Sequence, residues 1–75
     1  MREHHRELIR ELTAVGIRPR LKRTRGDHYR IEWNVNGKVY YTLTSGTPSD
    51  RRGVFNARAH IRRQLRHAGI FRRRR

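Results

Sequence analysis

Two segments, one near each end of the chain, carry apolar residues at helical spacing. Across residues 2–15 an apolar side chain recurs every three or four positions, and charged residues fill most other positions. Gly16 follows, and a glycine in the left-handed conformation commonly ends a helix. The second pattern covers residues 54–68 and is followed in the same way by Gly69. We therefore predict a helix in each segment.

The second helix also has a recognisable start. Residues 47–50 read Thr-Pro-Ser-Asp, which combines a threonine cap, a proline at the first helical position and an acidic residue in the first turn. Gly53 is unfavourable inside a helix, so we expect the regular part of this helix to begin near Val54.

Between the helices the pattern changes to the alternation that is typical of strands. Two successive runs each place three apolar or aromatic side chains on one face. These are Tyr29, Ile31 and Trp33 in the first run and Val39, Tyr41 and Leu43 in the second. The segment 18–24 is short and basic and contains Pro19, which an edge strand tolerates and a central strand does not. We expect three antiparallel strands, with 18–24 at an edge.

The turn between the second and third strands decides which residues reach the core. Residues 34–37 read Asn-Val-Asn-Gly and fit either a two-residue Asn-Gly turn or a three-residue loop with a bulge. A two-residue turn pairs Val35 with Lys38 and puts the apolar residues of the two strands on opposite faces. A three-residue loop pairs Asn34 with Lys38 and gathers all six on one face. For that reason we predict the three-residue loop.

These elements predict an α+β fold. Residues 1–71 form a single α-β-β-β-α domain, in which both helices pack on one face of a three-stranded antiparallel sheet. The four consecutive arginines 72–75 are too charged to pack and are expected to form a disordered basic tail. The other sheet face is then open to solvent. By alternation, it carries Arg20, Lys22, Thr24, His28, Arg30, Lys38, Tyr40 and Thr42.

The charge of the chain narrows its function. Its 75 residues include 20 Lys and Arg against 6 Asp and Glu, which gives a net charge of +14. A field of this strength favours a polyanion. Nucleic acid, with RNA preferred, fits better than a membrane, because no amphipathic segment presents exposed apolar residues to a lipid surface. With no cysteine, no apolar run of transmembrane length and no signal-like segment, we expect a cytoplasmic protein.

No metal or other cofactor is expected. The absence of cysteine excludes a thiolate zinc site. The histidines do not replace it, because His4 and His5 are adjacent on a helix and should point apart, while His60 and His67 have no carboxylate near them in the sequence.

An arc of arginines runs beside the apolar stripe of the second helix. It consists of Arg51, Arg52, Arg58, Arg62, Arg63 and Arg66. No acidic residue follows Asp50 to pair with them, so we predict that the arc contacts nucleic acid. On both surfaces cations hold phosphates, and Tyr40 stacks on a base. The candidate binding residues are Arg20, Lys22, Gly26, Arg30, Lys38, Tyr40, Arg51, Arg58, Arg62 and Arg66.

Three segments resemble the HicA family of toxins. Residues 7–12, Glu-Leu-Ile-Arg-Glu-Leu, with the Val-Gly-Ile of residues 15–17, look like the first helix of that family. Residues 26–29, Gly-Asp-His-Tyr, are similar to the motif that begins its second strand, and residues 59–70 are similar to its closing helix. The resemblance covers most of residues 5–70 and depends on the order and spacing of short motifs.

HicA proteins are small, metal-independent mRNA interferases with a fold like the double-stranded-RNA-binding domain, held inactive by a HicB antitoxin. The resemblance implies that His28 is catalytic and that an acidic, antitoxin-like protein is a partner. Such a histidine, with Arg30 and Lys22 beside it, supplies an acid or a base for attack of the RNA 2'-hydroxyl, and Gly26 lets the RNA backbone approach. From the residues alone, Gly26-Asp27 is a turn and His28 an exposed strand residue. The alternative function is therefore a non-catalytic RNA- or DNA-binding module, of phage or regulatory origin.

Overall fold

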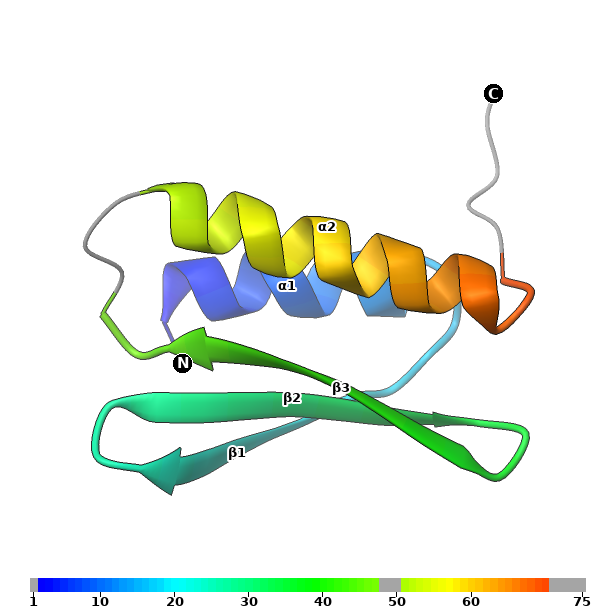
Figure 1. The fold of residues 1–75 in the computed structure, drawn as a ribbon, viewed down its shortest axis with the longest axis horizontal. Helices are drawn as coiled ribbons and strands as arrows, with labels where there is room; N and C mark the ends of the chain where they lie inside the picture. The colour runs from blue at the N-terminus through cyan, green and yellow to red at the C-terminus, as the bar shows by residue number, and fades with distance from the viewer. Residues whose placement is uncertain (1, 48–50, 71–75) are drawn as a thin grey trace.

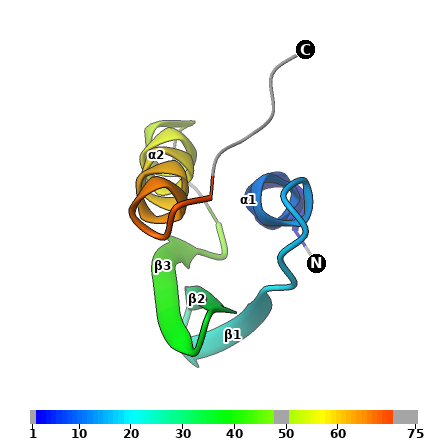
Figure 2. The same ribbon diagram turned by 90° about the vertical axis from the view of Figure 1, so that its right-hand side faces the viewer.

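The chain has the predicted order of helix, three strands and helix (Figure 1). The computed structural model describes residues 2–47 and 51–70. Both helices lie over the same face of one antiparallel sheet, whose strand order is β1-β2-β3 (Figure 2). The predicted α+β fold and the edge position of the first strand are confirmed. The elements are α1 (Glu3–Thr13), β1 (Arg20–Arg25), β2 (His28–Val35), β3 (Lys38–Ser45) and α2 (Arg51–His67).

Both helices end at the predicted glycines. Gly16 and Gly69 have φ angles of 82° and 79°, in the left-handed region. The residue after each glycine then donates its backbone N–H to a carbonyl in the last turn of the helix. Ile17 donates to Leu12 at 3.0 Å, and Ile70 donates to Leu65 at 2.8 Å. These bonds satisfy carbonyl groups that the end of a helix otherwise leaves unpaired.

The start of α2 differs from the prediction. The helix already begins at Arg51, so Gly53 lies inside it and the expected start near Val54 is wrong. Packing of the apolar stripe of α2 outweighs the low helix propensity of one glycine. Residues 48–50 of the predicted cap and the basic tail 72–75 lie outside the described residues.

The connection between β2 and β3 is a two-residue turn, not the predicted three-residue loop. Val35 pairs with Lys38, and the residues between them, Asn36 and Gly37, have positive φ angles of 53° and 85°. The Asn34 Oδ1 atom accepts the Gly37 N–H at 2.9 Å. Asn-Gly is the sequence that best tolerates this turn, whose twist matches that of the flanking strands. Turn chemistry therefore outweighs the gathering of apolar residues on one face.

The two-residue turn reverses the predicted faces of β3. Tyr40 now lies opposite Trp33, and Thr42 lies opposite Ile31, on the side that the helices cover. The residues of β3 that we expected in the core are instead exposed: Val39 to 56%, Tyr41 to 43% and Leu43 to 63%. Their predicted place in the core is wrong. The predicted place of Lys38, Tyr40 and Thr42 on the open face is also wrong, because Lys38 pairs with Val35 and lies beside Tyr40 on the other side of the sheet.

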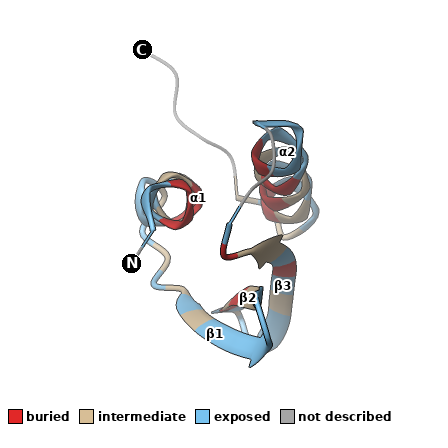
Figure 3. Ribbon diagram, turned by 90° about the vertical axis from the view of Figure 1, so that its left-hand side faces the viewer, coloured by how far each residue is buried: buried red, intermediate tan, exposed pale blue. Residues whose placement is uncertain are grey.

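The core fills the space between the two helices and the centre of the sheet. Figure 3 shows the buried residues on the sides of α1, α2 and the sheet that face one another. Trp33 is only 3% exposed, as the alternation along β2 predicts. Among the described residues, no helix is long and apolar enough to cross a membrane. The buried apolar residues are Leu8, Leu12, Ile31, Trp33, Val54, Ala57, Ile61 and Leu65.

This register predicts very different costs for two truncations in the sheet. Ile31→Ala should lower the free energy of unfolding by about 2 to 5 kcal/mol, because it removes a fully buried side chain. Leu43→Ala should change it by less than about 1 kcal/mol, because Leu43 is mostly exposed. Urea denaturation followed by tryptophan fluorescence measures both. Equal losses would show that Leu43 is in the core and that the register is wrong.

Candidate nucleic-acid interface

The uncovered side of the sheet is here called the open face. It consists of Arg20 and Lys22 on β1, His28, Arg30 and Glu32 on β2, and Val39, Tyr41 and Leu43 on β3. Lys22 pairs in register with Arg30, and Arg20 with Glu32. The Lys22 Nζ and Arg30 Nε atoms lie 2.7 Å and 3.0 Å from the two carboxylate oxygens of Glu32. The hydrogen bond from Lys22 lowers the pKa of the Glu32 carboxyl, so the group stays ionised. One carboxylate thus fixes two cations and leaves an excess of positive charge on this face.

Tyr41 supplies the aromatic group of the open face. The Arg30 guanidinium carbon lies 4.1 Å from the centre of the Tyr41 ring, within the range of a cation–π contact. Val39 and Leu43 flank Tyr41 on β3 and are also exposed. Sequence alternation pointed to Tyr40 for this role, and only the turn type, which sets the register, identifies Tyr41.

Tyr40 has a different place. It is half-buried on the helix-covered side, where its ring stacks on Trp33 with centroids 6.3 Å apart. Lys38 places its Nζ atom 5.3 Å from the Tyr40 ring, next to the hairpin turn. Tyr40 therefore packs against the core and does not offer the stacking platform that we predicted.

His28 begins β2 on the same side of the sheet as Arg30 and is exposed. It lies in register with Arg25 and with Ser45. With Thr24, Arg25 and Leu43 it lines a shallow hollow of about 380 Å³. Among the described residues, its ring has no hydrogen-bond partner, and the cations expected beside it are held by Glu32.

The Gly-Asp pair before His28 has a structural role. Gly26 has a φ of 54°, which the turn between β1 and β2 requires. The backbone carbonyl of Asp27 accepts the Gly46 N–H at 2.7 Å, and its carboxylate accepts the Thr47 N–H at 3.0 Å. A Cβ atom on Gly46 would collide with the Asp27 carboxylate and the Tyr29 ring. These contacts tie the β1–β2 turn to the end of β3. The fold alone therefore explains why Gly26 and Asp27 stand before His28, without a role in catalysis.

His4 and His5 do not point apart as predicted. Both are buried, and their Nε2 atoms lie 2.6 Å and 3.0 Å from the backbone carbonyl oxygen of Ser45. Since a carbonyl oxygen only accepts, both Nε2 atoms carry a proton. The His5 ring also lies 4.8 Å from the Tyr29 ring. Adjacent helical residues converge here because α1 begins directly over the end of β3.

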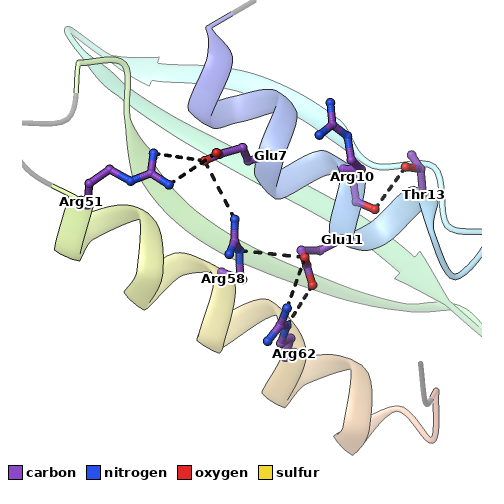
Figure 4. A network of polar contacts seen from close by, with 7 residues as sticks. All are labelled: Glu7, Arg10, Glu11, Thr13, Arg51, Arg58 and Arg62. Atoms are coloured by element: carbon purple, nitrogen blue, oxygen red, sulfur yellow. Dashed lines mark hydrogen bonds and ion pairs between the residues drawn. The ribbon is translucent and has the colours of Figure 1, made fainter. Parts of the chain in front are cut away.

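The arginine arc of α2 is largely engaged with α1. The Glu7 carboxylate forms ion pairs with Arg51 and Arg58, at nitrogen–oxygen distances of 3.3 Å and 4.0 Å. Glu11 forms one with Arg62 at 2.9 Å (Figure 4). The hydrogen bond that Arg62 donates to the Glu11 carboxylate raises the pKa of the Arg62 guanidinium. The prediction that the arc lacks acidic partners is therefore wrong for these three arginines, because the glutamates come from a helix more than 40 residues earlier in the chain.

The candidate binding residues thus divide between two sides of the molecule. Arg20, Lys22 and Arg30 share the open face, with Gly26 in a turn at one end of it. Arg51, Arg58 and Arg62 lie between the helices, on the side of the sheet that the helices cover. Arg66 is exposed on the last turn of α2. The structure does not bring all the predicted residues into one surface.

Comparison of the chain with protein-family models, with curated proteins and with solved structures finds no match. Within the described residues, no cluster of three or more His, Asp or Glu side chains is arranged to hold a metal ion. The features that bear on function are therefore the open face and the chemistry of its own residues.

The His5 environment predicts a pH-dependent stability. Burial lowers the pKa of His5 below its usual 6.5, which favours the neutral ring in the fold. Its contribution to stability is then fully present above about pH 6.5 and is lost as the pH falls through the lower folded-state value. Between pH 7.5 and 5.5 we expect the wild-type melting temperature to fall more than that of His5→Gln, whose amide keeps a donor but does not titrate. Equal pH dependence in both proteins would contradict this role of His5.

Proposed function

We propose that this protein binds nucleic acid, with RNA preferred, through the open face of the sheet. The observation that carries the proposal is the grouping of Lys22 and Arg30 beside the exposed ring of Tyr41 on a face that no helix covers. Cations on a sheet hold phosphates, and an exposed aromatic ring beside them stacks on a base whatever its identity. No metal or cofactor is part of the proposal, and we place its action in the cytoplasm.

The distribution of acidic residues supports the same proposal. Glu7 and Glu11 are engaged with α2, Glu32 with its two cations and Asp27 with backbone N–H groups. These carboxylates neutralise a minority of the basic side chains, and the net charge of +14 remains to act on a partner. Such a charge attracts a polyanion and releases its counterions on binding.

The open face is favoured over the arginine arc as the main contact. The arc would have to exchange its bonds with Glu7 and Glu11 for bonds with phosphate, which reduces the gain in free energy. On the open face one carboxylate serves Lys22 and Arg30 together, and Arg20 is exposed beside them. Arg20, Lys22 and Arg30 thus face one carboxylate, whereas Arg51, Arg58 and Arg62 share two.

Binding should be steeply salt-dependent and should depend more on the open face than on the arc. If about six to eight phosphates are contacted, the slope of log affinity against log salt should lie near −4 to −7. Arg30→Gln should weaken binding and make the slope shallower by about 0.7 to 0.9, the contribution of one phosphate. Fluorescence anisotropy with a labelled RNA measures both quantities.

Arg62→Gln is the matched control for Arg30→Gln. Each substitution removes one positive charge and leaves the paired glutamate with another arginine or lysine. We expect Arg62→Gln to have the smaller effect. A flat salt response in the wild type would remove the nucleic-acid proposal, and equal effects of the two substitutions would place binding elsewhere.

RNA cleavage by His28, as in the HicA toxins that the chain resembles, is a second candidate function. It is favoured by the exposure of His28 in a hollow at the end of the open face, with Arg25 in register beside it. A general acid or base must be reached by the RNA, and a neighbouring arginine stabilises charge that develops on phosphate. Under this proposal a small acidic protein would act as the antitoxin-like partner.

His28→Ala separates the two candidates. If His28 acts as acid or base, the substitution should abolish RNA cleavage in the presence of a chelator while RNA affinity changes by no more than about threefold, because other cations provide most of the attraction. Gel electrophoresis of labelled RNA measures cleavage, and anisotropy measures binding. If the wild type binds RNA and leaves it intact over hours, the cleavage candidate is wrong and the binding function stands.

A further inference from the structure

A second concave feature lies between β3 and α2, beyond the edge of the open face. It is a groove of about 440 Å³. One wall belongs to β3 and the other to α2, and the two elements are in direct contact along it. Its polar and aromatic lining, with one glycine, comes from Tyr41, Thr42, Gly53, Asn56, His60 and Gln64.

A chain of hydrogen bonds fixes the side chains on the floor of this groove. The Gln64 Nε2 atom lies 3.5 Å from the Tyr41 carbonyl oxygen and 3.2 Å from His60 Nε2. Because an amide nitrogen only donates, His60 Nε2 accepts, and His60 Nδ1 therefore carries the proton that is donated to Thr42 Oγ1 at 2.9 Å. This arrangement leaves the Gln64 Oε1 atom as an acceptor, while the buried Thr42 hydroxyl fixes the His60 ring.

The groove offers neutral hydrogen-bonding groups, with no charged side chain in its lining. Asn56 adds an amide that is exposed and has no hydrogen-bond partner among the described residues. Amides and hydroxyls pair well with the edge of an uncharged planar heterocycle, which carries donors and acceptors side by side. A phosphate or a carboxylate would find no cation there.

Gly53 leaves the backbone of α2 uncovered beside the groove. It lies inside α2, where glycine weakens a helix relative to alanine, and its φ angle is not in the left-handed region. A Cβ atom at this position would meet no described atom within 4 Å. Neither backbone conformation nor packing within the described residues therefore requires a glycine. A glycine here does permit close approach of a ligand to the helix.

The groove is continuous with the open face and has a basic rim. Tyr41 lines both surfaces, with Arg30 against its ring. On α2, Arg63 follows His60 by three residues, so it lies on the same side of the helix, and it is exposed. A strand whose phosphates cross the open face would thus meet a neutral groove followed by another cation.

We propose that this groove binds an unpaired base of a single-stranded nucleic acid. The inference rests on the proposed nucleic-acid binding and adds a preference for unpaired bases. An added peptide strand is disfavoured, because Gln64 already occupies the outward Tyr41 carbonyl that such a strand would need. A base needs only the edge groups of Asn56 and Gln64 and the space above Gly53.

The test compares two strands with equal phosphate number. One is a fluorescein-labelled single-stranded RNA of about twelve nucleotides, and the other carries 1',2'-dideoxyribose spacers in place of its central nucleotides. Anisotropy at one salt concentration should show that the wild type binds the intact strand at least about tenfold more tightly, the range expected for a bound base. Asn56→Ala and Gly53→Ala should reduce the ratio of the two affinities, intact strand over spacer strand, to about two or less. Neither substitution should weaken binding of the spacer strand.

Thr13→Ala is the control, because it also replaces a small exposed polar residue by alanine, on α1 and outside the groove. It should keep the wild-type ratio. Circular dichroism should show that Gly53→Ala melts at a higher temperature than the wild type, so that weaker base binding is not a folding defect.

The outcomes distinguish this inference from the proposed function. If neither strand is bound, the proposed function is wrong and the groove inference falls with it. If the wild type binds both strands equally and with a steep salt dependence, the function stands and the groove inference is wrong. If the intact strand is preferred but Asn56→Ala and Gly53→Ala keep the full ratio, the base binds elsewhere and the groove inference is again overturned.

Discussion

The two-residue turn at Asn36 and Gly37 is the constraint on which the surfaces of this protein depend. Its two positive φ angles set the pairing of β3 with β2. Because side chains alternate along a strand, a shift of one residue would exchange the two faces of β3. The turn thereby places Tyr41 outside, beside Arg30, and Thr42 inside, against His60. Both the open face and the floor of the groove follow from one dipeptide.

The sequence predicts the elements well, because each one has a local signal. Apolar spacing and the terminal glycines define both helices, and alternation defines β2. The register was missed for a physical reason: the hydrophobic pattern and the Asn-Gly turn favour opposite answers, and the turn prevails. A small domain with a core of eight buried apolar residues tolerates three exposed apolar side chains on β3 more readily than a turn with the wrong twist.

The polar contacts could not be predicted because they join residues far apart in the chain. Glu7 and Arg51 are 44 residues apart, and His4 and Ser45 are 41 apart. A search for acids near the arginine arc along the sequence finds none, yet α1 presents Glu7 and Glu11 one turn apart on the side facing α2. Single exposed ion pairs contribute little, but this network lowers the repulsion within a helix whose described charged residues are all basic.

The end of β3 is a meeting point for three distant parts of the chain. The Ser45 carbonyl holds the start of α1, while Gly46 and Thr47 hold the β1–β2 turn through Asp27. Each of these bonds closes a long loop, so its formation costs chain entropy. Once formed, they fasten α1, the turn and β3 together, and the two histidines that hold the Ser45 carbonyl are themselves buried. This corner of the fold therefore behaves as a single cooperative unit, in which the first turn of α1 protects a strand that lies some 40 residues further along the chain.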